Sequence, residues 1–266
     1  MKNKKLIILF SILMFLTVLV VLSSTLFTLQ TVSVKWYTEK NKMLDYKDYE
    51  ITESVALGES IFLVQKDDIT TSLEKKYPYM RVVGVETKFP NKIVLHVAER
   101  SGLYAIKKSD SNYAILDEYG KVLDDDFDNS TFVKMAESSL GGAPIEMKFT
   151  GLAIKDEDMV VGEIIKVEKV REFLSNLSLG FRKASHIPET SMGLFKYINV
   201  MHDNGEYMVS MQTRRGIVIE MSDGQVDTTE KLLLGIARYN EMRTAGDVEG
   251  VVKVFYSDKF GTNIAE

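Results

Sequence analysis

The chain has 266 residues, of which 45% are hydrophobic and 10% aromatic, and it contains no cysteine. This apolar content is enough to bury one large core or two small ones. The absence of cysteine excludes a disulfide framework, a cysteine-ligated metal site and a thiol nucleophile. A net charge of −5 without a basic block argues against nucleic acid as a partner.

The N-terminal region predicts a membrane anchor. Residues 6–29 carry no charge and follow a lysine-containing tail, residues 1–5. A helix of that length spans roughly 36 Å at about 1.5 Å per residue, enough for a hydrocarbon core of about 30 Å. The lysines place the tail in the cytoplasm and everything after residue 29 outside, with Trp36 and Tyr37 at the membrane interface. The alternative is a cleaved signal peptide, whose apolar region is usually about 7–15 residues long, with small residues at 23–25 before the cut.

The next 70 or so residues alternate between strand and helix patterns. The predicted elements are strand 31–37, helix 47–57, a helix opening at residue 66 and ending at 77, strand 81–88 and strand 92–100. The last strand places Ile93, Leu95 and Val97 on one face and Arg100 on the other. This order predicts a small α+β unit with helices on one face of its sheet.

Residues 101–266 have the pattern of a β-rich module with two helices. The predicted elements are strands 103–107 and 113–117, an acidic surface excursion over 124–144, helix 164–177, strands 197–201, 207–212 and 216–221, a helix opening at 227, and strand 250–256. Asp227 and Glu230 have the spacing of a capping box. The residues after the last strand are predicted to form a short polar tail.

Several short motifs resemble one known family. They are Tyr77-Pro78, Phe89-Pro90-Asn91, Val97-Ala98-Glu99-Arg100 and the run Ala114–Val122, with Asp117 and Gly120 three apart. Together they resemble the FtsQ/DivIB family of bitopic bacterial cell-division proteins. The resemblance implies an α+β fold with a single N-terminal transmembrane helix (6–29), a POTRA domain of β-α-α-β-β order (30–100) and a C-terminal mixed β domain with flanking helices (101–266).

No catalytic or metal-binding pattern emerges from the sequence. His96, His186 and His202 lack metal-type spacing, and Asp124, Asp126 and Asp128 open a calcium-type loop that lacks its glycine and its final glutamate. A Ser-x-x-Lys match at 72–75 has none of the companion motifs of penicillin-binding enzymes. The sequence therefore predicts a protein that is not an enzyme and has no cofactor and no metal.

The C-terminal strand is the predicted binding site. If residues 251–257 end the sheet, their free backbone groups can accept a strand from another chain. The alternative is that Val252, Val254 and Tyr256 only pack on their own core. The predicted partner-binding residues are Val252, Lys253, Val254, Phe255, Tyr256, Ser257, Asp258 and Phe260. Lys253 stands where the family often has an aspartate.

The family resemblance implies the partners and the location. It implies binding of coiled-coil division proteins of the FtsB/DivIC and FtsL types, an indirect link to septal peptidoglycan synthases, and contact with membrane lipid through residues 6–29. The predicted location is the cytoplasmic (inner) membrane at the division septum, with the body outside the cytoplasm. The alternative is a membrane-anchored exported enzyme or sensor of the cell envelope that uses a POTRA-like spacer.

Overall fold

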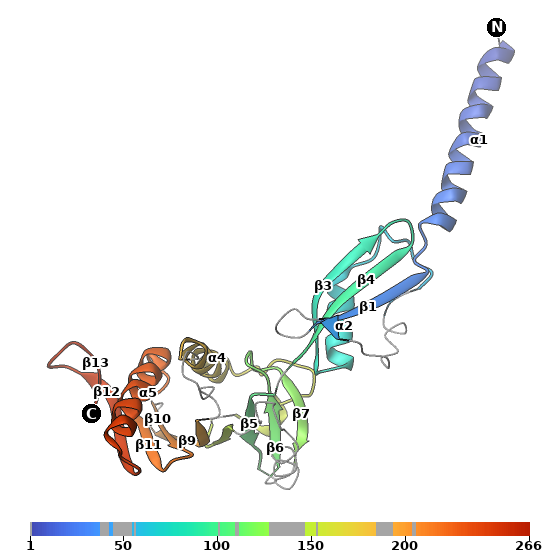
Figure 1. The fold of residues 1–266 in the computed structure, drawn as a ribbon. Helices are drawn as coiled ribbons and strands as arrows, with labels where there is room; N and C mark the ends of the chain where they lie inside the picture. The colour runs from blue at the N-terminus through green and yellow to red at the C-terminus, as the bar shows by residue number, and fades with distance from the viewer. Residues whose placement is uncertain are drawn as a thin grey trace. The chain divides into compact units, whose positions relative to one another are not determined.

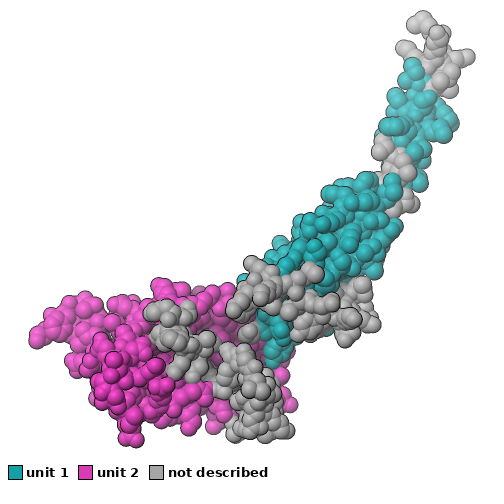
Figure 2. All heavy atoms as spheres, in the orientation of Figure 1, with its two compact units in different colours: residues 1–100 teal, residues 101–266 magenta. Residues whose placement is uncertain are grey.

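The fold was analysed in a computed structural model, which is α+β and divides into two compact units, residues 1–100 and 101–266. Figure 2 colours the two units separately, and each is described by itself. The structure describes residues 2–37, 43–44, 55, 57–100, 102–109, 112–127, 147–152, 154–184, 194–203 and 206–266.

The first unit begins with α1 (Lys2–Leu26), a helix of 25 residues. Large apolar side chains such as Phe10 and Phe15 are exposed along it. Among the helices in the described part of the chain, none has the length and hydropathy that crossing a membrane requires. The predicted end of the membrane segment at residue 29 is wrong, because α1 ends at Leu26 and Leu29 is buried in the core of this unit. Membrane insertion of residues 6–26 stays a prediction.

A four-stranded sheet forms the body of the first unit, in the order β2-β1-β4-β3 (Figure 1). Its elements are β1 (Thr31–Tyr37), β2 (Met43–Leu44), α2 (Lys66–Lys76), β3 (Met80–Lys88) and β4 (Lys92–Glu99). β1 runs parallel to β4, and β3 runs antiparallel to it. The strands predicted at 31–37, 81–88 and 92–100 and the helix predicted from residue 66 are confirmed. The helix predicted over 47–57 lies almost wholly outside the described residues.

The core of the first unit lies between this sheet and α2. Ile93, Leu95 and Val97 are fully buried, as their alternation predicts, and pack with Leu73 of α2. The expected position of Trp36 is wrong, because its indole is only 6% exposed and belongs to this core rather than to a membrane interface. The apolar face of the sheet packs against α2, and burial of the large indole ring in this core is favourable.

The prediction for Arg100 is also wrong. Its guanidinium does not point outward, because Nη2 lies 2.6 Å from Oε2 of Glu74 on α2. The second carboxylate oxygen of Glu74 accepts the N–H of Val82 on β3 at 2.8 Å. Arg100 Nε also donates to the carbonyl of Met80 at 3.2 Å. The ion pair therefore links α2 to the open end of the β3–β4 hairpin, where β3 begins and β4 ends.

The second unit is built on a nine-stranded mixed sheet in the order β13-β12-β11-β10-β9-β8-β5-β6-β7. Its elements are β5 (Tyr104–Lys107), β6 (Tyr113–Leu116), β7 (Val122–Phe127), β8 (Met147–Thr150), η2 (Asp156–Asp158), α4 (Glu168–Lys183), β9 (Phe195–Asp203), β10 (Glu206–Thr213), β11 (Ile217–Met221), α5 (Thr228–Ala245), β12 (Gly250–Ser257) and β13 (Thr262–Ala265). Most neighbours are antiparallel, but β5–β8, β8–β9 and β11–β12 are parallel.

Both long helices of this unit contribute to its core. Phe173 and Leu177 of α4 and Leu232 and Ile236 of α5 are buried against the inward-facing residues of the sheet. The two helices touch each other at Gly180, where an added Cβ would lie 2.7 Å from Leu232 Cδ2. Figure 1 shows α5 beside β11 and β12, which places this helix under the C-terminal end of the sheet.

Three local predictions for the second unit need correction. The acidic excursion predicted over 124–144 begins later, because β7 extends to Phe127, and residues 128–144 lie outside the described part. The capping box does not form: Asp227 has φ 50° and makes no side-chain cap bond. Thr228 instead donates its hydroxyl to the carbonyl of Gly224 at 2.7 Å. The tail after β12 is not irregular, because it contains β13.

Candidate partner-binding edge

The predicted binding strand β12 is not at the edge of the sheet. It lies between β11, which pairs with it in parallel, and β13, which returns antiparallel to it. Lys253 and Glu266 exchange both backbone hydrogen bonds at 3.0 Å, and the ladder continues to Ser257 opposite Thr262. The expectation that residues 251–257 end the sheet is therefore wrong, since the chain itself supplies the next strand.

Among the strands in the described part of the chain, β13 is the outermost on this side of the sheet and forms its free edge. Hydrogen-bonded pairs alternate along an antiparallel ladder, so Thr262 and Ile264 bond toward β12, as Glu266 does. Asn263 and Ala265 therefore direct their backbone N–H and C=O groups away from β12. An added strand would form its backbone hydrogen bonds with these two residues.

A tight turn connects the two strands. The N–H groups of Phe260 and Gly261 both donate to the carbonyl of Ser257, at 3.1 and 2.8 Å. Gly261 has φ 62°, a left-handed conformation that glycine adopts without steric cost. The sequence does contain a signal for this turn, the polar pair Asp258-Lys259 followed by Phe260-Gly261. The hairpin was not predicted, because its second strand has only four residues.

The predicted site residues separate into two groups. Val252 and Val254 are fully buried and belong to the core beneath α5, so their side chains are not available to a partner. The exposed members are Tyr256 and Phe260, at 54% and 62%, together with Lys253 and Asp258. Phe255 and Ser257 are half-buried.

The exposed aromatic rings lie beside the hairpin turn. Lys259 Nζ lies 5.2 Å from the centroid of the Phe260 ring, a cation–π contact. Tyr256 belongs to a non-hydrogen-bonded pair with Asn263, so its ring stands next to the free edge strand. The structure thus brings Tyr256 and Phe260 to the same end of the β12–β13 hairpin.

Strand β13 is held to the body of the unit by a polar contact and by α5. Asn263 is only 7% exposed, and its Nδ2 donates to Oδ2 of Asp227 at 3.3 Å. α5 also lies against β13, and Gly235 lets this helix approach the neighbouring strands β11 and β12, because an added Cβ would lie 2.6 Å from Ile219 Cγ2 and 3.3 Å from Val254 Cγ2. The edge strand therefore has a fixed position, which an incoming strand needs.

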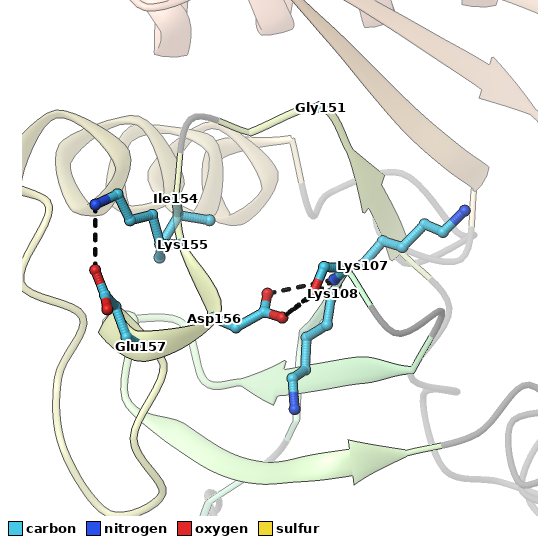
Figure 3. A pocket seen from close by; sticks show the side chains of 8 residues that line it. Lys107, Lys108, Gly151, Ile154, Lys155, Asp156 and Glu157 are labelled. Atoms are coloured by element: carbon cyan, nitrogen blue, oxygen red, sulfur yellow. Dashed lines mark hydrogen bonds and ion pairs between the residues drawn. The ribbon is translucent and has the colours of Figure 1, made fainter.

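A shallow hollow elsewhere in the second unit is the other candidate site (Figure 3). Its lining includes three lysines and two acids, and Lys155 pairs with Glu157 at 3.2 Å. The hydroxyl and the N–H of Ser109 donate to the Asp156 carboxylate, and these bonds lower the pKa of Asp156. Lys108 Nζ donates to the carbonyl of Asp125 at 2.8 Å, and no described histidine lies among the lining residues.

The described histidines have ordinary partners. His96 Nδ1 lies 3.0 Å from the Tyr37 hydroxyl and its Nε2 lies 3.4 Å from Glu86 Oε2, while the ring of His202 packs edge-on against Tyr207. His186 lies outside the described residues. Within the part of the chain that the structure describes, no group of three or more potential metal ligands comes together.

The comparisons with known proteins agree with the first unit's fold. Residues 39–100 match the family model described as "POTRA domain, FtsQ-type". The resemblance to the FtsQ/DivIB family is confirmed. The chain is 30% identical over 156 residues to "Cell division protein DivIB" of Clostridium tetani (strain Massachusetts / E88), covering 57% of this chain and 51% of the relative.

A second relative has the same description. The chain is 28% identical over 121 residues to "Cell division protein DivIB" of Clostridium botulinum (strain Hall / ATCC 3502 / NCTC 13319 / Type A), covering 46% of this chain and 45% of the relative. The chain thus matches about half the length of each of these curated relatives.

Proposed function

We propose that this protein is a membrane-anchored scaffold of bacterial cell division. Residues 6–26 anchor it, the POTRA domain and the β domain lie outside the cytoplasm, and the protein acts at the septum by binding rather than by catalysis. Its FtsQ-type POTRA domain and its similarity to proteins described as DivIB support this role. The strand that accepts the partner is β13, the outermost described strand, because β12 lies inside the sheet.

The binding mechanism we propose is strand addition to β13. A segment of a coiled-coil division protein of the FtsB/DivIC type, with FtsL, pairs with Asn263 and Ala265. Tyr256 and Phe260 then cover the partner's side chains, since exposed aromatic residues are common energetic anchors of interfaces. Through these partners the scaffold influences septal peptidoglycan synthases. The observation that carries the mechanism is the free backbone edge of β13, held in place by Asn263 and α5.

The decisive experiment blocks the edge without disturbing the hairpin. Ala265→Pro removes one outward N–H and adds a ring that obstructs an incoming strand, while Ile264 and Glu266 retain their bonds to β12. Ala265→Val is the matched control, because it adds bulk but keeps the N–H. We expect Ala265→Pro, but not Ala265→Val, to lose co-purification with the coiled-coil pair encoded by the same genome.

A second pair of variants tests the aromatic anchors. Tyr256→Ser with Phe260→Ser removes both rings at the hairpin. The control Val248→Ser removes an apolar side chain that is more exposed than either ring, at 72%, and lies outside β12 and β13. The first should weaken partner recovery by about tenfold or more, in line with the loss of two interface anchors. Full recovery with both Ala265→Pro and the double variant would refute binding at this edge.

A further inference from the structure

Three phenylalanine rings from separate segments meet on the surface of the first unit. Phe27 follows α1, Phe62 lies in the turn before α2, and Phe89 lies in the turn between β3 and β4. Their ring centroids are 5.1 Å apart for Phe27–Phe62, 5.5 Å for Phe62–Phe89 and 6.4 Å for Phe27–Phe89. We name this group the aromatic cluster.

The aromatic cluster is not part of the hydrophobic core. Phe62 and Phe89 are 63% and 62% exposed, and the adjacent Leu63 is 73% exposed. The core of this unit is made by other residues, on the face of the sheet that α2 covers. Moving an exposed phenylalanine or leucine side chain out of water is favourable, so this surface gains from contact with apolar surroundings.

The cluster lies where the uncharged N-terminal segment joins the folded domain. α1 ends at Leu26, and the carbonyl of the next residue, Phe27, already accepts the N–H of Ile61 at 2.7 Å. The pairing continues as Thr28 bridges Ser60 and the N–H of Leu29 donates to Glu59 at 2.8 Å. No linker separates the helix from the domain, so the domain cannot move away from whatever surrounds the end of α1.

The sheet register brings the third ring to the same end. Thr31, the first residue of β1, is opposite Lys92, the first residue of β4, so the β3–β4 turn that carries Phe89 lies where β1 begins (Figure 1). Lys88 and Lys92 flank this turn, and Asn91 Nδ2 donates to Oε1 of Gln30 at 2.9 Å. Aromatic rings surrounded by lysines and amides suit the boundary between acyl chains and lipid headgroups.

We infer that the aromatic cluster is a membrane-docking surface, which inserts Phe62, Leu63 and Phe89 into the outer interface of the bilayer that holds α1. The inference rests on the proposed anchoring of residues 6–26. Lipid is the occupant that this anchoring implies, because the uncharged helix α1 ends at Leu26, directly before Phe27 of the cluster. The cluster thus takes the interfacial role that the sequence assigned to Trp36 and Tyr37, and it orients the POTRA domain against the membrane.

The absence of cysteine in the chain makes a direct test possible. Single-cysteine variants Leu63→Cys, Glu99→Cys and Met14→Cys of the full chain are spin-labelled and reconstituted into phosphatidylethanolamine–phosphatidylglycerol vesicles. Collision rates with oxygen, which concentrates in lipid, and with a water-soluble nickel chelate then report the surroundings of each label. Glu99 is the control, because it is exposed at the far end of β4, roughly 23 Å from Lys92 at about 3.3 Å per residue.

We expect the labels at Met14 and Leu63 to be accessible to oxygen and the label at Glu99 to be accessible to nickel, with a several-fold lower nickel rate at Leu63 than at Glu99. Adding Phe62→Ser and Phe89→Ser should return the Leu63 label to water while the Met14 label stays in lipid. Both rings are largely exposed, so these changes leave the core intact.

The other outcomes overturn the inference in distinguishable ways. If the Leu63 label reacts with nickel as the Glu99 label does while the Met14 label stays in lipid, anchoring holds and docking is refuted. If the Leu63 label is shielded from both reagents, the cluster contacts protein instead of lipid, which also refutes docking. If the Met14 label itself is in water, the anchoring fails and the docking inference fails with it.

Discussion

The Glu74–Arg100 ion pair should stabilise the first unit, and Arg100→Met tests this directly. The two side chains are only 15% and 10% exposed, and their charged atoms lie 2.6 Å apart. Methionine keeps most of the buried stem but leaves the Glu74 carboxylate without its cation, beside the N–H of Val82. Breaking a buried pair costs about 3–5 kcal/mol, so partial exposure suggests a loss of about 2–4 kcal/mol here.

The chain offers a selective assay for this loss. Trp36 is its only tryptophan and lies in the core of the first unit, so tryptophan fluorescence during urea unfolding of the detergent-solubilised chain reports that unit. Lys88→Met is the control, because Lys88 and Glu86 are about half exposed and 3.6 Å apart. Such a surface pair contributes about 0–1 kcal/mol.

The coupling between the two charges provides the refuting result. Glu74→Gln and the double variant complete a double-mutant cycle with Arg100→Met, and the cycle isolates the pair energy. If Arg100→Met costs no more than Lys88→Met, or if the two single losses simply add, then the pair does not hold α2 to the hairpin.

Three further predictions concern the second unit and can be checked by far-UV circular dichroism during unfolding. Burial raises the pKa of the Tyr104 hydroxyl, so the folded state favours the neutral form. The wild type should therefore lose stability relative to Tyr104→Phe as the pH rises above about 10, where the unfolded chain loses this proton. Parallel stability–pH profiles of the two proteins would contradict this. Gly235→Ala should cost about 1–3 kcal/mol by overpacking against Ile219, whereas an unchanged midpoint would mean that α5 shifts freely. Lys231 Nζ donates to the carbonyls of Ser222 and Asp223, at 2.9 and 3.0 Å. Lys231→Met should therefore lower the free energy of unfolding by about 1–3 kcal/mol. An unchanged free energy would show that these carbonyls find other donors.

The sequence predicted the elements of the first unit well where local patterns are strong. Ile93, Leu95 and Val97 are spaced by two along β4, as one face of a strand requires, and the acids and lysines at the two ends of α2 suit its dipole. Arg100 was misplaced by alternation, and Trp36 was misplaced because its position after the uncharged segment predicted a membrane interface. A period-2 pattern assigns a face but does not show which neighbour, here α2, comes close enough to attract a side chain away from solvent.

The candidate site shows the same division between local and tertiary information. Alternation alone identified β12, including the buried Val252 and Val254, because β-branched residues at every second position indicate a half-buried strand. β13 has only four residues, too few for a periodic pattern, and pairing with β12 rather than propensity makes it a strand.

The sequence by itself thus determined the family resemblance, the uncharged N-terminal segment and most of the strands, since each depends on residues close together in the chain. Only the tertiary structure decided that β13 forms the free edge and that Phe27, Phe62 and Phe89 meet on one surface. Both features join residues that are distant in the chain or that lack a pattern of their own, and chain folding alone brings such residues together.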